Sequence, residues 1–397
     1  MSLQERIQTL SRERAEQVIG FRRHLHQHPE LSFQEHNTAR FVAEQLKSFG
    51  LSPQEGVADT GVVATIEGRK PGKTVALRAD MDALPIKEAN DVPYKSQNDG
   101  VMHACGHDVH TSSLLGTAYI LQQLREEFEG TVKLVFQPGE ERFPGGASLM
   151  IKDGVLENPK PDNMLGQHVL PHLPVGKVGF REGMYMASAD EIYLTIRGKG
   201  GHAAMPEKNI DPVMITSQVL VTLQQVISRA ANPKIPSVLS FGKVIAEGAT
   251  NVIPNEVYLE GTFRTLNEEW RHKAHQKIRQ IVTGIAESLG GSAEVDIKVG
   301  YPFLQNNPEL TQRVKQSAIE YLGEENVVDL DLWMAAEDFA YYTHHVDACF
   351  YRLGTGNEAK GITSGVHTPT FDIDEQALDI WPGLMSWLTL TELASGT

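Results

Sequence analysis

The sequence predicts an α/β protein with a mostly parallel sheet, helices on both faces of that sheet, and an inserted ferredoxin-like α+β domain. In the first and last parts of the chain, short β-rich segments alternate with amphipathic helical segments, as in parallel βαβ units. Between them the predicted order becomes β-α-β-β-α-β, the ferredoxin-like order. The chain of 397 residues is also too long to fold around one compact core. We therefore expect a larger domain formed by residues 1–186 and 300–397, and an inserted domain formed by residues 187–299.

The first part of the chain contains helical and β-rich segments of the larger domain. The first helix has to end before Pro29, which cannot continue it, and the second ends near Gly50, a suitable C-terminal cap. Helices are expected at about 12–25, 38–49 and 108–126. Strands are expected to begin at Gly61, Thr74 and Thr131.

The inserted segment alternates like a strand from Ala189, and Asp211 with Pro212 then provides a helix cap and first turn. Its helices are expected at about 211–229 and 267–289, and its further strands from Ser237, Val257 and Ala293. After Gly300 the α/β pattern resumes. Helices are expected from Pro308, around Glu337 and from about Glu375, and a strand from Cys349.

Charge and cysteine usage exclude several classes of protein. The chain has 36 Lys+Arg against 51 Asp+Glu, a net charge of −15, so we expect no binding to nucleic acid or to anionic membranes. The two cysteines, Cys105 and Cys349, cannot form a disulfide framework, which favours a reducing compartment. The polar N-terminus lacks a signal-peptide core, and no apolar run approaches the roughly 20 residues of a membrane span. We expect a cytoplasmic protein.

Residues with metal-binding or acid–base chemistry follow several predicted strands. Asp80 and Asp82 lie in RADMDALP, and the segment FQPGEE ends in Glu140 and Glu141. Because ligands of an open α/β sheet bind outside the carboxyl ends of its strands, this shared location predicts a site. One carboxylate of the Glu pair can bind a metal while the other acts as general base, although a bare Glu-Glu pair is usually an exposed acidic loop.

Cys105 and His107, in MHACGHDVH, can direct a thiolate and an imidazole to one point, as zinc and related metals require. A cysteine nucleophile with a histidine base is an alternative, but residues two apart rarely reach the geometry it needs. A buried structural pair is the other alternative. His168, at the end of MLGQH, is expected just after a strand, and both it and His367 are weak candidates when taken alone. The segment HLHQHPE, residues 24–30, is interpreted as the structural end of the first helix.

Eight motifs in order resemble a known family. They are RRHLHQHPE, RADMDALP, MHACGHDVH, FQPGEE, GKGGHAAMP, TNVIP, AEDF and VHTP, and they extend from about Arg22 to His367. Together they are similar to the dinuclear metallohydrolases related to aminoacylase and glutamate carboxypeptidase. The resemblance is greatest to the branch of N-acyl-amino-acid amidohydrolases, hippurate hydrolases and auxin-conjugate hydrolases.

The resemblance implies a site with two divalent metal ions per subunit. Glu140 matches the general base, and Asp82 the acidic residue that supports a ligand. Asp80 stands where other branches have a His ligand, so its role is open, and Cys105 is a candidate for the bridge between the metals. Zinc or manganese is expected, with cobalt and nickel as further candidates. The residues that match the metal ligands are Cys105, His107, Glu141, His168 and His367.

In the inserted domain, His202, Asn251 and Arg264 match substrate-binding positions of the family. The resemblance implies that they hold the substrate's carboxylate and the oxyanion, with His202 and Asn251 reaching the site from the partner subunit. The resemblance thus also implies that the inserted domain is a lid and dimerisation domain, through which the protein forms a homodimer. Without the family, GKGGHAAMP could be a turn and Asn251 a cap.

The function that the resemblance implies is hydrolysis of N-acyl amino acids to a carboxylic acid and a free amino acid by metal-activated water. Glu140 takes the proton from water and passes it to the leaving amine. A dipeptidase or carboxypeptidase with the same site is the alternative for short peptide substrates. A metal-binding scaffold would have no need of Glu140, and a zinc deaminase is excluded because P-C-x-x-C is absent.

Overall fold

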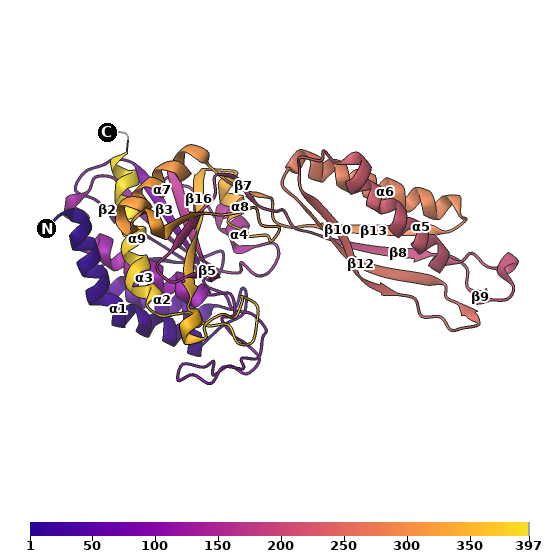
Figure 1. The fold of residues 1–397 in the computed structure, drawn as a ribbon, viewed down its shortest axis with the longest axis horizontal. Helices are drawn as coiled ribbons and strands as arrows, with labels where there is room; N and C mark the ends of the chain where they lie inside the picture. Colours follow the sequence, from indigo (N-terminus) through magenta and orange to yellow (C-terminus); the bar gives the residue numbers. More distant parts are fainter. Residues whose placement is uncertain (396–397) are drawn as a thin grey trace. The chain divides into compact units, whose positions relative to one another are not determined.

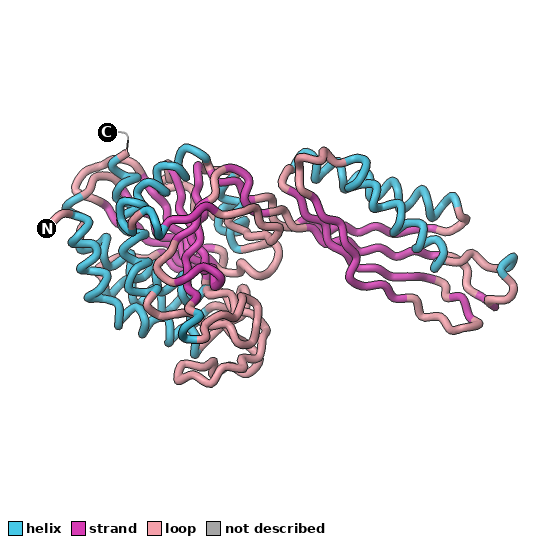
Figure 2. Tube along the Cα trace, in the orientation of Figure 1, coloured by secondary structure: helices cyan, strands magenta, loops and turns pink. Residues whose placement is uncertain are grey.

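The computed structural model describes residues 1–395 and divides the chain into two compact units (Figures 1 and 2). The first unit contains Met1–Gly183, Gln305–Asp331 and the chain from Asp338 onward. The second contains Met184–Leu304 and Leu332–Glu337. The chain passes between them at β7 (Gly183–Met186), at β14 (Leu304–Asn306) and at both ends of Leu332–Glu337. Each unit has its own hydrophobic core, so each is described separately.

The first unit is built on an eight-stranded sheet in the order β1-β2-β4-β3-β5-β16-β6-β15. Its four central strands, β4-β3-β5-β16, are parallel, and antiparallel pairs occur at β1-β2, β2-β4 and β16-β6. The strand bounds are β1 Gln54–Val57, β2 Gly61–Glu67, β3 Thr74–Asp80, β4 Thr131–Gln137, β5 Asn163–Pro174, β6 Val178–Phe180, β15 Val327–Asp329 and β16 Asp347–Gly356. The prediction of a mostly parallel α/β sheet is confirmed.

Helices cover both faces of this sheet, and its central strands β3 and β4 are buried along nearly their whole length as a result. Val75, Leu77 and Ala79 of β3 belong to one core with side chains of the five longer helices. On the other face, a Cβ at Gly166 of β5 would lie 2.6 Å from Phe339, just before the short helix α8. The helix bounds are α1 Leu3–Gln27, α2 His36–Ser48, α3 His107–Gln123, α4 Gly146–Lys152, α7 Pro308–Leu322, α8 Ala340–Thr343 and α9 Ala377–Ala394.

The second unit has the predicted ferredoxin-like arrangement. Its antiparallel sheet has the order β10-β12-β8-β13, and one face packs on α5 and α6. β9 and β11 form a separate two-stranded ribbon. The bounds are β8 Asp190–Arg197, β9 Gly201–His202, α5 Pro212–Gln225, β10 Ser237–Ile245, β11 Val252–Ile253, β12 Glu256–Thr265, α6 Glu268–Ser288 and β13 Ser292–Val299.

The structure corrects some of the expected elements. No helix surrounds Glu337, since the short helix α8 begins only at Ala340. α1 begins at Leu3 rather than near Arg12, because Ser2 and Glu5 form a capping box ahead of it. Within residues 1–395, none of the helices combines the length and apolarity that crossing a bilayer demands.

A buried ion network fixes α1 against the start of α3. The guanidinium of Arg22 is fully buried and lies 2.9 Å from Asp108 and 2.7 Å from Asp372. Asp108 also faces the ring of His26 at 2.8 Å. Although burial raises the pKa of Asp108, its cationic neighbours Arg22 and His26 outweigh burial and hold that pKa far below the ordinary range. This network therefore tethers the helix that carries His107.

We predict that Arg22→Ala lowers the free energy of unfolding by about 3–5 kcal/mol, because the buried Asp108 would lose the guanidinium that pairs with it. Arg23→Ala is the matched control. Arg23 is the next residue on α1, but its side chain is 48% exposed in its ion pair with Glu375. Arg23→Ala should lower the free energy of unfolding by at most about 1 kcal/mol. Urea unfolding of both variants measures the difference, and equal losses would contradict the assignment.

Candidate metal centre

The predicted metal-binding segments meet at one edge of the first unit's sheet. Asp80 is the last residue of β3, and Glu140 and Glu141 follow the adjacent parallel strand β4. Cys105 lies in the loop that leads into α3, whose first residue is His107. His168 lies inside β5, not after a strand as its position in the sequence suggested. The carboxyl ends of neighbouring parallel strands therefore bring these side chains together.

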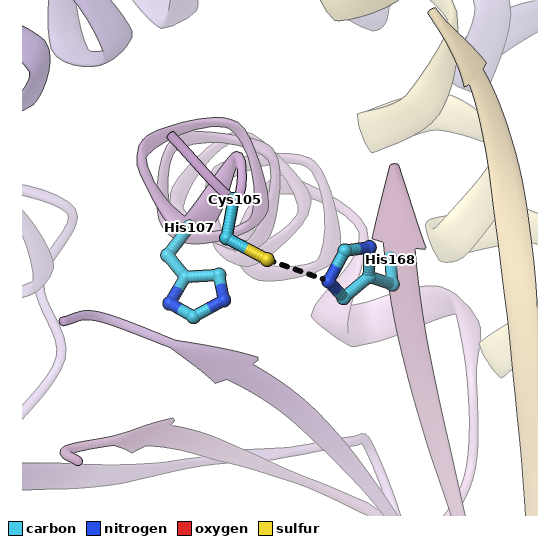
Figure 3. Close-up of side chains that lie close together, drawn as sticks. All are labelled: Cys105, His107 and His168. Atoms are coloured by element: carbon cyan, nitrogen blue, oxygen red, sulfur yellow. Dashed lines mark hydrogen bonds between the residues drawn. The ribbon is translucent and has the colours of Figure 1, made fainter. Parts of the chain in front are cut away.

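Cys105 lies at the centre of the cluster. Its Sγ is 3.4 Å from Nε2 of His168, as the dashed line in Figure 3 marks, and 3.3 Å from Nε2 of His367. The same nitrogen of His367 is 3.1 Å from Oε1 of Glu141. His367 has φ of 61°, which is uncommon for a residue with a side chain, and its N–H donates to the Ala104 carbonyl at 2.7 Å. This bond ties the His367 loop to the Cys105 loop.

The donor atoms form overlapping sets, and within each set all the atoms lie within 4.8 Å of one another. Cys105, His107 and His168 make one set, and Cys105, Glu141 and His367 make another. A third set joins His107 to Glu140 and Glu141. All five residues that match family ligands are thus brought into one cluster, and Cys105 is shared by two sets.

Hydrogen bonds fix which nitrogen of each ring faces the cluster. His168 Nδ1 lies 2.8 Å from the Val169 carbonyl oxygen, and His107 Nδ1 lies 2.9 Å from the Asp82 carbonyl oxygen. A carbonyl oxygen can only accept, so Nδ1 carries a proton in both rings, and in the neutral form that binds a metal ion Nε2 is the atom with the lone pair. In the part of the chain that the structure describes, His107 Nε2 is buried and forms no hydrogen bond. A metal ion would satisfy this atom, so the residues fit one.

Electrostatics also favour a cation at this position. Burial, followed by the charges of Glu141 and Glu140, raises the pKa of the Cys105 thiol well above its ordinary value. Burial opposes a charged ring at His107, but Asp80 and Asp82 outweigh it and raise the pKa of His107 to about 10. Without a metal ion this ring therefore holds a second proton at Nε2, at the place where a metal ion would supply the positive charge instead. Carboxylates and a thiolate crowded in a buried space repel one another. A divalent cation relieves that repulsion and is the partner that such a donor set selects.

Comparison with known proteins identifies the family of the chain. The model of the peptidase family M20/M25/M40 matches residues 76–382. The chain belongs to this family. The matched segment covers every residue of the cluster described above, including His367.

Relatives in the family have related activities. An N-acyl-L-amino acid amidohydrolase of Geobacillus stearothermophilus is 47% identical over 297 residues, 75% of this chain and 80% of that protein. An N-acetyl-L-cysteine deacetylase of Bacillus subtilis is 40% identical over 91% of this chain and 85% of that protein. The crystal structure of a dinuclear metal-binding peptidase from Bacillus subtilis has a TM-score of 0.83, 36% identity, and coverage of 96% of this chain and 99% of its own.

The three residues expected to bind substrate lie in the second unit of this family member. His202 lies on β9 and pairs with Val252 of β11, and the N–H of Ala203 donates to the Asn251 carbonyl at 3.0 Å. The ribbon therefore brings His202 and Asn251 together. Arg264 lies on β12 instead, where its guanidinium donates to the carbonyl of Phe263 at 3.2 Å and to the hydroxyl of Thr262.

Several supporting residues were not identified from the sequence. One of them is Ser32, whose Oγ donates to Asp82 at 2.6 Å. Asp82, the residue expected to support a ligand, also accepts from the N–H of Glu141 at 2.9 Å. The buried carboxylate of Glu35 accepts from the N–H of Gly139 at 2.8 Å, one residue before Glu140. No spacing relates Ser32 or Glu35 to these partners, because the bonds depend on tertiary contacts. His110 could have been found, since it lies one helical turn after His107.

We predict that Cys105→Ser weakens zinc binding by more than about 100-fold, since even residues that only orient a ligand are worth about 10–100-fold. Cys349→Ser is the matched control, because Cys349 is also a buried free cysteine but belongs to none of the donor sets. Zinc per chain after dialysis and the zinc-dependent rise in melting temperature measure both effects. Unchanged zinc binding in Cys105→Ser would contradict the site.

Proposed function

We propose that this protein, a metal-dependent amidohydrolase, cleaves N-acyl amino acids to a carboxylic acid and a free amino acid. The observation that carries this proposal is the largely buried donor cluster around Cys105, with Glu140 beside it. Two relatives support the substrate class, the N-acyl-L-amino acid amidohydrolase and the N-acetyl-L-cysteine deacetylase. The substrates are small molecules, and nucleic acid and membranes are not expected among the partners.

Two divalent metal ions are assigned to the cluster, zinc or manganese in the first instance, with cobalt and nickel as further candidates. When bound, they lower the pKa of water and polarise the amide carbonyl. Sharing of Cys105 between two donor sets supports its role as the bridge. The proposed ligands are Cys105, His107, Glu141, His168 and His367.

Glu140 is proposed as the general base. Its side chain is buried beside Glu141, and its Oε1 accepts a hydrogen bond from the N–H of Asp338 at 3.4 Å. One carboxylate oxygen takes the proton of the attacking water and then delivers it to the leaving amine nitrogen. Asp82 holds His107 in the tautomer that ligation needs and also holds the backbone of Glu141.

The inserted domain is proposed to bind substrate and to form a homodimer. We assign residues 1–186 and 300–397 to the catalytic domain and 187–299 to the lid and dimerisation domain. His202 and Asn251 would reach the partner's site, and Arg264 would hold the α-carboxylate of the substrate. β10 supports the dimer, because it is an edge strand with Val238, Val244 and Ile245 exposed. Such an edge readily pairs with a second copy.

A cytoplasmic location is also proposed. Neither Cys105 nor Cys349 forms a disulfide within residues 1–395. A reducing compartment keeps both thiols in this state. For Cys105 that state is required, because the thiolate is the metal ligand.

We predict that Glu140→Gln keeps its metal ions but lowers kcat by about 10²–10⁴-fold, because the amide cannot accept the proton. Glu141→Gln is the neighbouring control and should instead lose metal affinity. Metal content and hydrolysis of N-acetyl amino acids are measured for both. Less metal in Glu140→Gln, with an active Glu141→Gln, would reverse the two roles.

The same assay tests the substrate class. N-acetyl amino acids should be cleaved faster than dipeptides of the same amino acid, and much faster than N-acetyl amino acid amides. The amide lacks the carboxylate that Arg264 is proposed to bind, which would leave a desolvated guanidinium without its partner. Faster cleavage of dipeptides would refute the N-acyl amino acid proposal, and equal rates on acid and amide would remove Arg264 from the site.

We predict that mixing two inactive variants, His202→Ala and Glu140→Ala, restores part of the wild-type activity after subunit exchange. If His202 acts in the partner's site, each mixed dimer has one site with both lesions and one site with neither. If His202 acts within its own subunit, every site keeps one lesion and mixing restores nothing. Full activity of a monomer would equally contradict the dimer.

A further inference from the structure

His110 is a buried histidine of α3 that lies outside the proposed ligand set. Its Nδ1 is 2.6 Å from Oδ1 of Asp80, and its Nε2 accepts a hydrogen bond from the N–H of Val169 at 2.9 Å. A peptide N–H can only donate, so Nε2 carries the lone pair and Nδ1 carries the proton. Both ring nitrogens are therefore engaged with the protein, and neither remains for a metal ion.

Asp80, which accepts from His110, is itself held firmly. Its other oxygen is 2.5 Å from the buried guanidinium of Arg78, and its backbone carbonyl accepts from Thr111 Oγ1 at 2.8 Å. Arg78 in turn donates to Gln137 at 3.0 Å and to Asp338 at 2.7 Å. Asp80 is thus a fixed anchor for His110, although it stands where other branches of the family have a ligand.

Val169 connects His110 to the ligand His168. The pairing of β3 with β5 ends at Gly166, so His110 supplies the acceptor for the Val169 N–H beyond that point. The Val169 carbonyl accepts from Nδ1 of His168 at 2.8 Å. The side chain of Val169 packs on the Cys105 loop, because a Cβ at Gly106 would lie 2.5 Å from its Cγ2. The backbone that orients the His168 ring is therefore fixed by His110 on one side and the Cys105 loop on the other.

We propose that His110 is a positioning residue that holds His168, and through it one of the two metal ions, by binding the Val169 backbone while Asp80 holds His110. The inference rests on the proposed assignment of His168 as a ligand. It gives Asp80 the role of orienting His110 rather than binding metal. The candidate donor group made of Asp80, His107 and His110 is therefore not assigned as a metal site.

Two variants divide the bonds of His110 between them. The amide of Asn reaches the position of Nδ1, so His110→Asn keeps the bond to Asp80 and loses the bond to Val169. The amide of Gln reaches the position of Nε2, so His110→Gln keeps the bond to Val169 and loses the bond to Asp80. The metal-free proteins are titrated with zinc in competition with a chromophoric chelator, which gives the affinity of each zinc equivalent.

We expect His110→Asn to weaken one of the two zinc equivalents by about 10–100-fold and to leave the other unchanged. His110→Gln should bind both equivalents nearly as tightly as the wild-type protein. Wild-type zinc binding in His110→Asn would overturn the proposal. An equal loss of zinc affinity in His110→Gln would also overturn it, because the effect would then lie in the bond to Asp80. So would an equal loss of affinity for both zinc equivalents, which would indicate a general structural role.

A measurement on the wild-type protein keeps the test valid if a variant fails to fold. Long-range ¹H–¹⁵N spectra of the zinc-loaded protein should show His110 protonated at Nδ1 and unprotonated at Nε2. The opposite tautomer would overturn the proposal. Because neither measurement uses a substrate, inactivity on N-acyl amino acids would refute the proposed substrate without affecting this result.

Discussion

Concentrated negative charge at the carboxyl edge of the parallel sheet is the constraint on which the site depends. Glu140 and Glu141 follow one strand, Asp80 ends the next, and all three act on the buried thiol of Cys105. Such a group of acids is costly to bury without a cation. The Nε2 atoms of His168 and His107 face the same space, so metal ions would complete the arrangement.

Hydrogen bonds from residues that bind no metal hold this arrangement in place. Asp82 contacts the ring of His107 and the backbone of Glu141, and Glu35 holds the backbone of Gly139. His110 does the same for the backbone next to His168. These supporting residues act on main-chain groups more often than on rings, because main-chain position determines where each ligand points. Precision at the site thus derives from the rigid strands and helices around it.

Much of the fold could be predicted from the periodicity of apolar residues and from the residues that begin and end helices. Alternation from Ala189 and the Asp211–Pro212 cap identified the ferredoxin-like unit, and Gly50 marked the end of a helix. The surroundings of His168 were harder to predict. β5 is buried on both faces over much of its length, so its sequence lacks alternation, and His168 was expected after a strand instead of within one. The contacts of Ser32 and Glu35 were beyond prediction, since they join segments far apart in the chain.

The location of the ions tests the central claim most directly. Anomalous scattering from crystals of the zinc-loaded protein, recorded on both sides of the zinc absorption edge, places each ion without reference to activity. The account predicts two peaks, both within about 2.3 Å of Cys105 Sγ, the usual zinc–sulfur distance, with one of them also bound by His168 Nε2. A single peak, or a peak held by Asp80 and His110 in place of Cys105, would contradict it.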